Sequence, residues 1–306
     1  MLINYSLSAV LFMLLVACGG AQDEEVRSAG VDPSADRGAS TSAGAQLQTA
    51  IRLYVFDCGR VSFQSVSGFG LAETDTLARE LAVPCYIIDH PRGQLLWDAG
   101  LPSELASKAG WVARGEGVEV YLETSLSHQL EAMELDFDLH SLEYAAFSHI
   151  HWDHVGAAND VASGEWLVQR GDYAGVVDAE NHPVPAVDLA LLEGIKDRPV
   201  RVLDGDHDVF GDGRVRLIAA YGHTPGHQVL YVDLADTGPV ILSGDLYHFR
   251  VSRSRRVVPL FNSNRDQTLA AMARVEREVT ETGATFWIQH DLALFETLRK
   301  APEFYQ

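Results

Sequence analysis

The sequence predicts an α/β domain in which β-sheets are covered by helices in layers, and three observations support this prediction. Short apolar runs rich in β-branched and aromatic residues recur from Ile51 onwards, and Gly, Asp, His or Pro lies close to most of their ends. Helical periodicity appears between these runs. Neither an internal repeat nor a second linker interrupts residues 51–306, so we expect one domain there.

Ten of the apolar runs are predicted strands. They are Leu53–Phe56, Tyr86–Ile88, Leu95–Trp97, Tyr144–Phe147, Trp166–Val168, Val200–Leu203, Val215–Ala220, Val229–Val232, Val240–Leu242 and Phe286–Ile288. A helix is predicted from Asn264, whose spacing to Gln267 resembles a capping box, to a C-cap at Gly283. Weaker helical patterns cover Leu126–Leu135 and Val187–Ile195.

The composition excludes several classes of protein. Of the 306 residues, 47% are hydrophobic and 22% are charged, which excludes disorder over most of the chain and a multi-span membrane protein. Lys and Arg total 23 against 43 Asp and Glu, a net charge of −20. Nucleic acid is therefore not an expected partner, because phosphate binding needs a surplus of basic residues.

The first residues indicate export. Leu7–Val16 is uncharged and too short to span a bilayer, as in a signal peptide. Leu15-Val16-Ala17-Cys18 resembles the bacterial lipobox, which implies cleavage before Cys18 and a lipid anchor in a membrane. No Lys or Arg precedes Leu7, which departs from the pattern, and the alternative is an ordinary cleaved signal with an incidental Cys. Gly19 in place of Asp favours the outer membrane.

Residues 19–50 contain much Gly, Ala, Ser and Asp and almost no large apolar residues. Such a stretch cannot bury enough surface to offset its ordering entropy, so it is interpreted as a flexible tether. The chain is therefore divided into a signal peptide (1–17), the lipidated Cys18 with its tether (18–50), and a folded domain (51–306).

The strongest chemical signal is the run Ser148-His149-Ile150-His151-Trp152-Asp153-His154, directly after a predicted strand. Residues two apart in an extended segment project to the same side, so His149 and His151 can hold one metal together. Asp153 and His154 lie just beyond and can hold a second metal.

Three further predicted strands run into ligand-type residues. These residues are His223 with His227, Asp245, and His290 with Asp291. Loops at strand ends are where a rigid sheet holds functional groups, and His and carboxylate are the ligands that Zn-type ions prefer. Four such coincidences favour a metal site over buried structural histidines.

The pattern His149-x-His151-x-Asp153-His154, followed by His223, Asp245 and His290, resembles the dinuclear metallo-β-lactamase superfamily over essentially all of residues 51–306. The resemblance implies an αββα sandwich, two mixed β-sheets flanked by helices. It implies one metal on His149, His151 and His223, a second on Asp153, His154 and His290, and Asp245 as the bridge. It also implies a turn or a ligand-supporting role for Asp98, a ligand-orienting role for Asp291, and a structural role for His227.

Two metals about 3.5–4 Å apart lower the pKa of a shared water and polarise a carbonyl, so the predicted reaction is hydrolysis of an ester-like or amide-like bond. Within the superfamily, His151 in place of Glu argues against oxygen or nitric oxide chemistry. Asp245 argues against the zinc β-lactamases. Only 16 residues follow His290, too few for the helical region of glyoxalase II-like thioesterases.

The layout is most similar to the N-acyl-homoserine lactonase branch. This implies attack of a metal-bridging hydroxide on the lactone carbonyl, with Asp153 passing the proton to the leaving group. The branch usually carries Tyr three residues after the bridging Asp, whereas this chain has His248, preceded by Tyr247. His248 can donate a similar hydrogen bond to the oxyanion, in which case the role of the Tyr is kept. The alternative is that the substrate is a different lactone or ester. For the two residues themselves, the alternatives are that His248 is a surface residue and that Tyr247 is a packed aromatic.

Other functions stay open at this point. The same metal pair serves an esterase, a thioesterase or a β-lactam hydrolase, and a metal- or lactone-binding lipoprotein without turnover is a third class. Zn is the expected metal, although Fe, Co and Mn suit the same ligands.

Three further groups of residues each allow two interpretations. The basic cluster Arg250, Arg253, Arg255 and Arg256 is expected to be a surface loop paired with acids rather than a substrate attractor. An acyl-chain pocket and ordinary core packing are both open for Phe63, Phe69 and Trp111. Two buried free thiols are favoured over a disulfide for Cys58 and Cys85.

Overall fold

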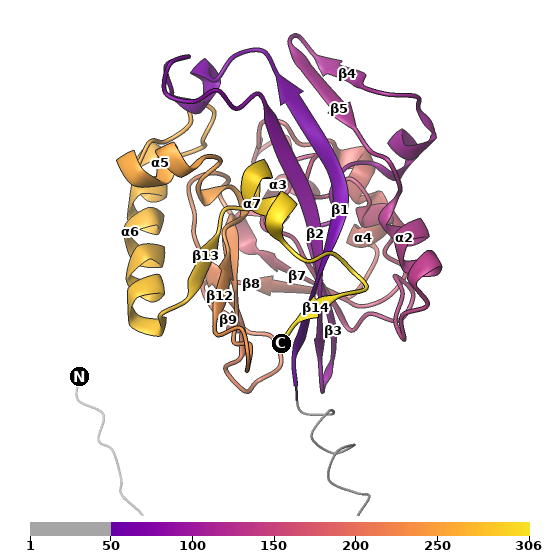
Figure 1. The fold of residues 1–306 in the computed structure, drawn as a ribbon. Helices are drawn as coiled ribbons and strands as arrows, with labels where there is room; N and C mark the ends of the chain where they lie inside the picture. The colour runs from indigo at the N-terminus through magenta and orange to yellow at the C-terminus, as the bar shows by residue number, and fades with distance from the viewer. Residues whose placement is uncertain (1–49) are drawn as a thin grey trace, which may run out of the picture. The chain divides into compact units, whose positions relative to one another are not determined.

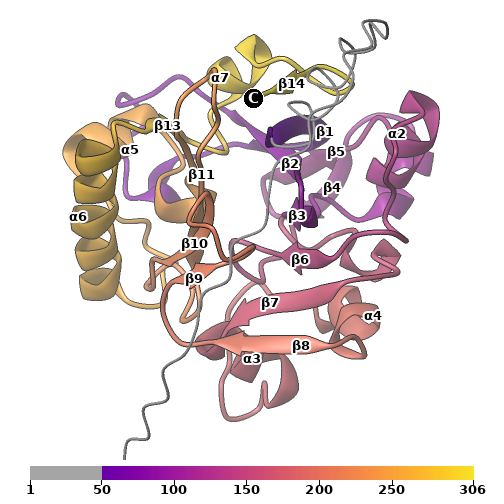
Figure 2. The same cartoon turned by 90° about the horizontal axis from the view of Figure 1, so that it is seen from below.

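The computed structural model describes residues 50–306, which contain two facing β-sheets with helices on their outer sides (Figure 1). Viewed from below, the layers run from α6 (Arg265–Thr282) through the smaller and the larger sheet to α2 (Leu126–Met133) and α4 (Glu193–Lys196) (Figure 2). The predicted αββα sandwich is confirmed. The predicted signal peptide, Cys18 and the predicted tether up to residue 49 lie outside the described residues.

The larger sheet has the strand order β4-β5-β1-β2-β3-β6-β7-β8, and β14 pairs with β1. Its strands are β1 (Arg52–Phe63), β2 (Glu80–His90), β3 (Gly93–Trp97), β4 (Val112–Gly115), β5 (Val118–Tyr121), β6 (Tyr144–Ala146), β7 (Glu165–Gln169), β8 (Val200–Leu203) and β14 (Phe304–Tyr305). Neighbours are antiparallel from β4 to β3 and parallel from β3 to β8.

The smaller sheet has the order β13-β12-β11-β10-β9. Its strands are β9 (His207–Asp208), β10 (Val215–Ala219), β11 (Gln228–Val232), β12 (Val240–Leu242) and β13 (Thr285–Trp287). Both β10 and β12 are antiparallel to β11, and β13 is parallel to β12. The carboxyl ends of β10, β12 and β13 therefore meet at one edge of the sheet, where their following loops carry the predicted ligands.

Shorter helices complete the described chain. They are α3 (Arg170–Val177), α5 (Arg250–Arg255), α7 (Leu292–Thr297) and the 3-10 turns η1 (Ser67–Phe69), η2 (Ser103–Ser107), η3 (Ala158–Asp160), η4 (Leu189–Leu192) and η5 (Gly244–Leu246). Within residues 50–306, none of the helices has the length and apolar character needed to cross a bilayer.

Alternation along the strands builds two cores around the smaller sheet. Leu217 and Leu230 face the larger sheet and pack in the cluster that contains the buried Trp97. Val229 faces outward and packs with Met272 of α6. Because both faces of β11 are covered, all five of its residues are buried, which explains its continuous apolar sequence.

The predicted helix after Asn264 is confirmed as α6. The Asn264 side chain accepts a hydrogen bond from the backbone N–H of Gln267 at 3.0 Å, which caps the first turn. Gly283 ends the helix with a φ of 70°, a left-handed conformation that glycine adopts without strain. Met272 and Val275 form part of the buried face, and each contributes about 1.5–3 kcal/mol by burial.

The expectation of free thiols at Cys58 and Cys85 is wrong, because the two residues form a disulfide. Strands β1 and β2 are antiparallel neighbours in which Phe56 pairs with Cys85, and a register shift follows between Asp57 and Arg60. The irregularity brings Cys58 beside Cys85, with 5.7 Å between their Cα atoms. Sequence spacing alone does not reveal this register.

The arginine cluster pairs with acids as expected, but it lies on helix α5 and its C-cap rather than on a loop. The pairs are Arg250 with Asp291, Arg253 with Glu276, and Arg255 with Asp75. Arg256 instead donates to the carbonyl of Leu269. The cluster thereby connects α5 to α6, to the start of α7 and to the segment before β2.

Candidate metal centre

The predicted ligands come together where the two sheets meet. The loop after β6 carries His149, His151, Asp153 and His154, the loop after β10 carries His223, η5 after β12 carries Asp245, and the residues after β13 carry His290. Because β6 belongs to the larger sheet and the other strands to the smaller one, the site joins both halves of the sandwich.

Three imidazoles face one another in the first group. His149 Nε2 lies 2.9 Å from His151 Nδ1 and 3.0 Å from His223 Nε2, and His151 Nδ1 lies 3.1 Å from His223 Nε2. Asp245 Oδ2 is 3.2 Å from His223 Nε2 and 3.6 Å from His149 Nε2. These four donor atoms could hold one ion among them.

The second group lies on the other side of the Asp245 carboxylate. His154 Nε2 is 3.2 Å from His290 Nε2, and Asp153 Oδ2 is 3.8 Å from both nitrogens. Asp245 Oδ1 is 2.8 Å from His290 Nε2 and 3.2 Å from His154 Nε2. One carboxylate therefore presents one oxygen to each group.

The donor set fits two cations. Asp245 Oδ1 is buried and accepts no well-aligned hydrogen bond among the described residues, although His290 Nε2 and His154 Nε2 lie 2.8 and 3.2 Å away, and such buried polar atoms are otherwise almost always paired. Three ring nitrogens that converge within about 3 Å cannot all be satisfied by shared protons, whereas a cation accepts all their lone pairs. Imidazole and carboxylate are the ligands of Zn-type ions.

The pKa values of the histidines differ between the two groups of ligands. Burial and the neighbouring imidazoles hold the pKa of His149 and of His151 well below the usual range, which leaves both rings neutral with free lone pairs. Burial would raise the pKa of Asp245, but the surrounding histidines outweigh it and lower the pKa well below its usual value. Burial would lower the pKa of His154, but the carboxylates of Asp245, Asp98 and Asp153 raise it well above the usual value.

Hydrogen bonds behind the ligands orient four of the five rings, and His151 instead turns its Nδ1 towards the centre. The pairs are His149 Nδ1 with Ser148 Oγ (3.0 Å), His154 Nδ1 with Asp98 Oδ2 (2.9 Å), His223 Nδ1 with Asn262 Oδ1 (3.0 Å) and His290 Nδ1 with the Ala82 carbonyl (2.7 Å). Each partner engages Nδ1, so Nε2 is turned towards the centre. Asn262 and Ala82 were not foreseen, because neither belongs to a ligand-type pattern in the sequence.

Two neighbouring residues, His227 and Asp291, have structural contacts. His227 Nδ1 donates to the Ala220 carbonyl at 2.9 Å, and its Nε2 accepts from the Asp245 N–H at 2.9 Å, so the ring spans two ligand loops. Burial and the nearby His223 lower the pKa of His227 to about 3. Asp291 accepts from the Leu294 N–H, which caps α7, and pairs with Arg250. The ligand-orienting role predicted for Asp291 is taken by the Ala82 carbonyl, which holds His290.

Tyr247 and His248 were both candidate catalytic residues, and the structure brings only His248 into the centre. Its Nε2 lies 3.0 Å from Asp245 Oδ2, and the ring is stacked on that of His290 with 5.6 Å between centroids. Tyr247 points away into the core between α6 and the smaller sheet, where it packs on Phe286. None of the predicted ligands is therefore among the aromatic rings that Tyr247 contacts within the described residues.

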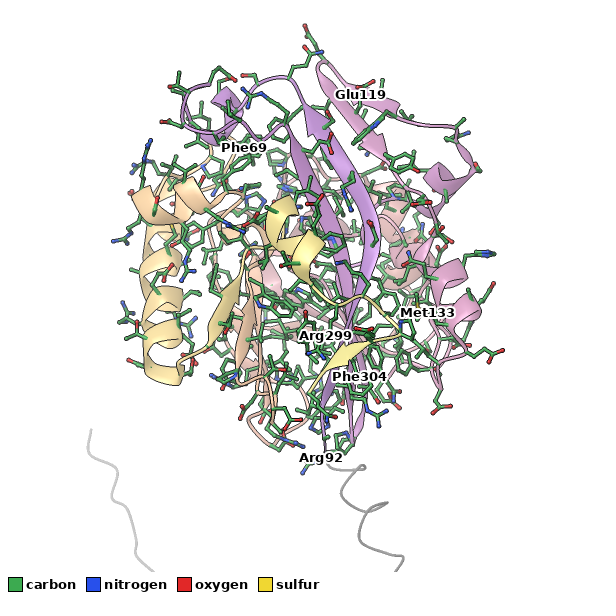
Figure 3. All side chains as sticks on the ribbon, in the orientation of Figure 1. Phe69, Arg92, Glu119, Met133, Arg299 and Phe304 are labelled. Atoms are coloured by element: carbon green, nitrogen blue, oxygen red, sulfur yellow. A yellow bond between two sulfur atoms is a disulfide. The ribbon has the colours of Figure 1, made fainter. Side chains whose placement is uncertain are left out.

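A cavity of about 730 Å³ borders His248 and His290. Its walls come from residues 75–80, from the start of α5 and from α7. Phe69, labelled in Figure 3 on the segment between β1 and β2, packs edge-on against His248 and against Phe261. Of the three aromatics considered from sequence, Phe69 contacts His248, Phe63 packs against Phe69, and Trp111 packs at a tilt on Tyr121.

Fold and site define the class of this protein. Residues 78–281 match the metallo-beta-lactamase superfamily, and the chain belongs to that superfamily.

Within it, the chain is similar to N-acyl homoserine lactonases. It is 28% identical over 272 residues to N-acyl homoserine lactonase AttM of Rhizobium johnstonii, a match that covers 84% of this chain and 99% of that protein. It is 24% identical over 260 residues to N-acyl homoserine lactonase AiiA of Bacillus thuringiensis subsp. kurstaki, with coverage of 84% and 99%.

Solved structures show the same fold. A variant of AiiA from B. thuringiensis with N-decanoyl-L-homoserine bound at its active site matches with a TM-score of 0.67 at 22% identity, covering 84% of this chain and 99% of that one. The dizinc quorum-quenching lactonase AidC, in complex with a product, matches with a TM-score of 0.57 at 16% identity, covering 84% and 94%.

Proposed function

We propose that this protein is a dinuclear metal-dependent hydrolase that opens the lactone ring of N-acyl-homoserine lactones, an activity that quenches quorum sensing. The Asp245 carboxylate supports this most directly, because its two oxygens face two separate groups of ligands. The names of the relatives point to the same substrate.

Two divalent cations bound by the seven ligands would supply a hydroxide nucleophile at neutral pH and polarise the lactone carbonyl. Among the protein's own groups, Asp153 is placed to move the proton. Its Oδ2 lies 3.8 Å from the Nε2 atoms of His154 and His290, while its side chain remains 14% exposed. Asp153 therefore reaches both the centre and the solvent. It would accept the proton of the hydroxide that adds to the carbonyl and deliver the same proton to the departing alkoxide.

His248 takes the place at which the lactonase branch carries Tyr. It lines the cavity, and burial lowers its pKa, so the ring is neutral and has one N–H, which faces Asp245 Oδ2 from Nε2 at 3.0 Å. With the Asp245 oxygens bound to the two ions, this N–H would turn to the substrate. We assign it the hydrogen bond to the substrate's carbonyl oxygen, which strengthens as negative charge develops. Tyr247 is assigned a packing role.

The cavity suits an amphipathic substrate. Leu77, Phe249, Val251 and Leu292 provide apolar wall, and Arg79, Arg250 and Glu296 provide polar rim. A lactone head placed against His248 and His290 leaves an acyl chain along the apolar wall and beside Phe69.

Zn is the proposed metal, and Fe, Co and Mn suit the same donors. We also propose export and tethering through a lipidated Cys18 in the outer membrane, on the basis of Leu7–Val16 and the lipobox-like sequence before Cys18. The Cys58–Cys85 disulfide supports export, because disulfides persist in oxidising compartments. Labelling with an alkyne fatty acid should mark the wild type and not Cys18→Ser; equal labelling would refute lipidation.

A substrate panel tests the function. Metal-loaded protein is mixed with short- and long-chain homoserine lactones, a γ-lactone, a thioester and a β-lactam in a weakly buffered pH indicator. Fastest acid release from a homoserine lactone supports the proposal. Preference for another compound would favour another hydrolase on the same metal pair, and release from none would favour a binding protein.

A further inference from the structure

We propose that Gln289 is a positioning residue that holds the two halves of the metal centre in register and thereby sets the affinity for the second ion. This rests on the proposed dinuclear centre. Gln289 follows β13 and immediately precedes the predicted ligand His290.

The Gln289 side chain is buried, and each of its polar atoms has a partner. Its Oε1 accepts from Trp97 Nε1 and from the backbone N–H of Gly244, each at 3.2 Å. Its Nε2 donates to Asp98 Oδ2. Its backbone N–H donates to Ser243 Oγ at 3.0 Å.

These partners belong to both sheets. Trp97 ends β3 of the larger sheet, and Asp98 follows it, whereas Ser243 and Gly244 follow β12 of the smaller sheet. One amide group therefore joins the two sheets at the edge that carries the ligands.

Two of these partners, Asp98 and Gly244, lead to ligands of the second group. Asp98 holds His154 through Nδ1 at 2.9 Å and also accepts from the backbone N–H of Ser148 at 2.6 Å. Gly244 immediately precedes Asp245. With His290 next in sequence, Gln289 fixes three of the four residues around the second ion.

Only an amide satisfies all these partners. The position needs a donor towards the Asp98 carboxylate and an acceptor for two N–H groups. Glu would set a second carboxylate against Asp98. Met would leave the Trp97 and Gly244 N–H groups buried without an acceptor.

Metal titration of the full-length protein against a chromophoric chelator, with Co(II) and Zn(II), tests the proposal. Q289E and Q289M are compared with Q169M. Gln169 is another buried glutamine in the larger sheet, bonded to Gly205, Tyr221 and Gln228, none of which is a predicted ligand. Q169M therefore loses buried hydrogen bonds, as the Gln289 variants do, but none of the lost bonds involves a predicted metal ligand.

We expect the wild type and Q169M to bind two ions. We expect both Gln289 variants to bind the first ion normally and the second about 10–100-fold more weakly. Wild-type affinity for both ions in Q289E and Q289M would overturn the proposal, as would equal weakening of both ions in all three variants. A wild type that binds no metal would refute the proposed function, and this inference with it.

Discussion

His154 is held between two carboxylates, with Nδ1 2.9 Å from Asp98 Oδ2 and Nε2 3.2 Å from Asp245 Oδ1. The first contact orients the ring, and the second places Nε2 at the position proposed for the second ion. A carboxylate behind a ligating histidine also increases its basicity, and hence its strength as a ligand.

Asp98→Asn removes this support. The variant is expected to bind the second ion about 10–100-fold more weakly, because an amide cannot accept from every N–H that Asp98 now serves. Isothermal titration with Zn(II) measures the change. Asp212→Asn, which alters a carboxylate paired with His90 and Arg214 outside the centre, is the control. Equal Zn(II) affinity in the two variants would exclude this role for Asp98.

Asp245→Ala and His223→Ala each remove a predicted ligand. Both variants should lose bound metal, and kcat/KM should fall by more than about 100-fold, since a ligand matters at least as much as the groups behind it. Elemental analysis and lactone hydrolysis give the two readouts. Full activity in either variant would overturn the ligand assignment.

His248→Phe removes the proposed hydrogen bond to the substrate and keeps an aromatic ring beside Phe69 and Phe261. We expect kcat to fall about 100-fold, the usual effect of losing one such donor. His248→Tyr restores the residue usual in the lactonase branch and should retain activity within about tenfold. If the Phe variant turns over as fast as the wild type, His248 is a packing residue.

The disulfide closes a segment with a sequence separation of 27. Replacing both Cys58 and Cys85 by Ser is expected to lower the free energy of unfolding by about 3–4 kcal/mol through the added entropy of the unfolded chain. Guanidinium unfolding with and without reductant measures this effect. Reductant should destabilise the wild type and leave the double variant unchanged; a wild type insensitive to full reduction would contradict the prediction.

Asp172 predicts a pH dependence of stability. Burial raises the pKa of this carboxyl to about 7 from its usual 3.8, although Thr224 Oγ1 and the Gly226 N–H donate to it. Folding therefore favours the protonated form, and stability falls as pH rises from about 4 to about 7, then levels off. At about 1.4 kcal/mol per pH unit, the free energy of unfolding falls by at most about 4 kcal/mol in total.

Asp172→Asn should remove most of this fall, because Asn keeps an acceptor for Gly226 and can donate to the Thr224 hydroxyl. The measurement is denaturant unfolding of the zinc-saturated protein at pH 5 and pH 8. If the difference between the two pH values is the same in wild type and variant, Asp172 does not titrate in this range.

The sequence predicted the elements whose apolar pattern is strong. All ten predicted strands overlap strands of the structure, and α6 follows from its cap at Asn264 and its apolar face. The centre was also predictable in outline, since ligand-type residues end several strands and parallel strands bring their carboxyl ends together.

Other features were not predictable, because they depend on tertiary contacts. The hairpin β4–β5 has little apolar alternation and forms against β1. Helix α5 contains several arginines and is stabilised by acids from distant segments. The contacts of Asn262 with His223 and of Gln289 with Asp98 join segments that are far apart in the chain. The pairing of Cys58 with Cys85 follows from a strand register that local sequence does not encode.

The central claim is that seven side chains, from His149 to His290, hold two ions on either side of Asp245. Elemental analysis of protein purified with Zn(II) and then desalted tests it most directly. The account predicts two ions per chain, falling to one or none when Asp245 is replaced by Ala. A protein that retains no metal, or that keeps both ions without Asp245, would contradict it.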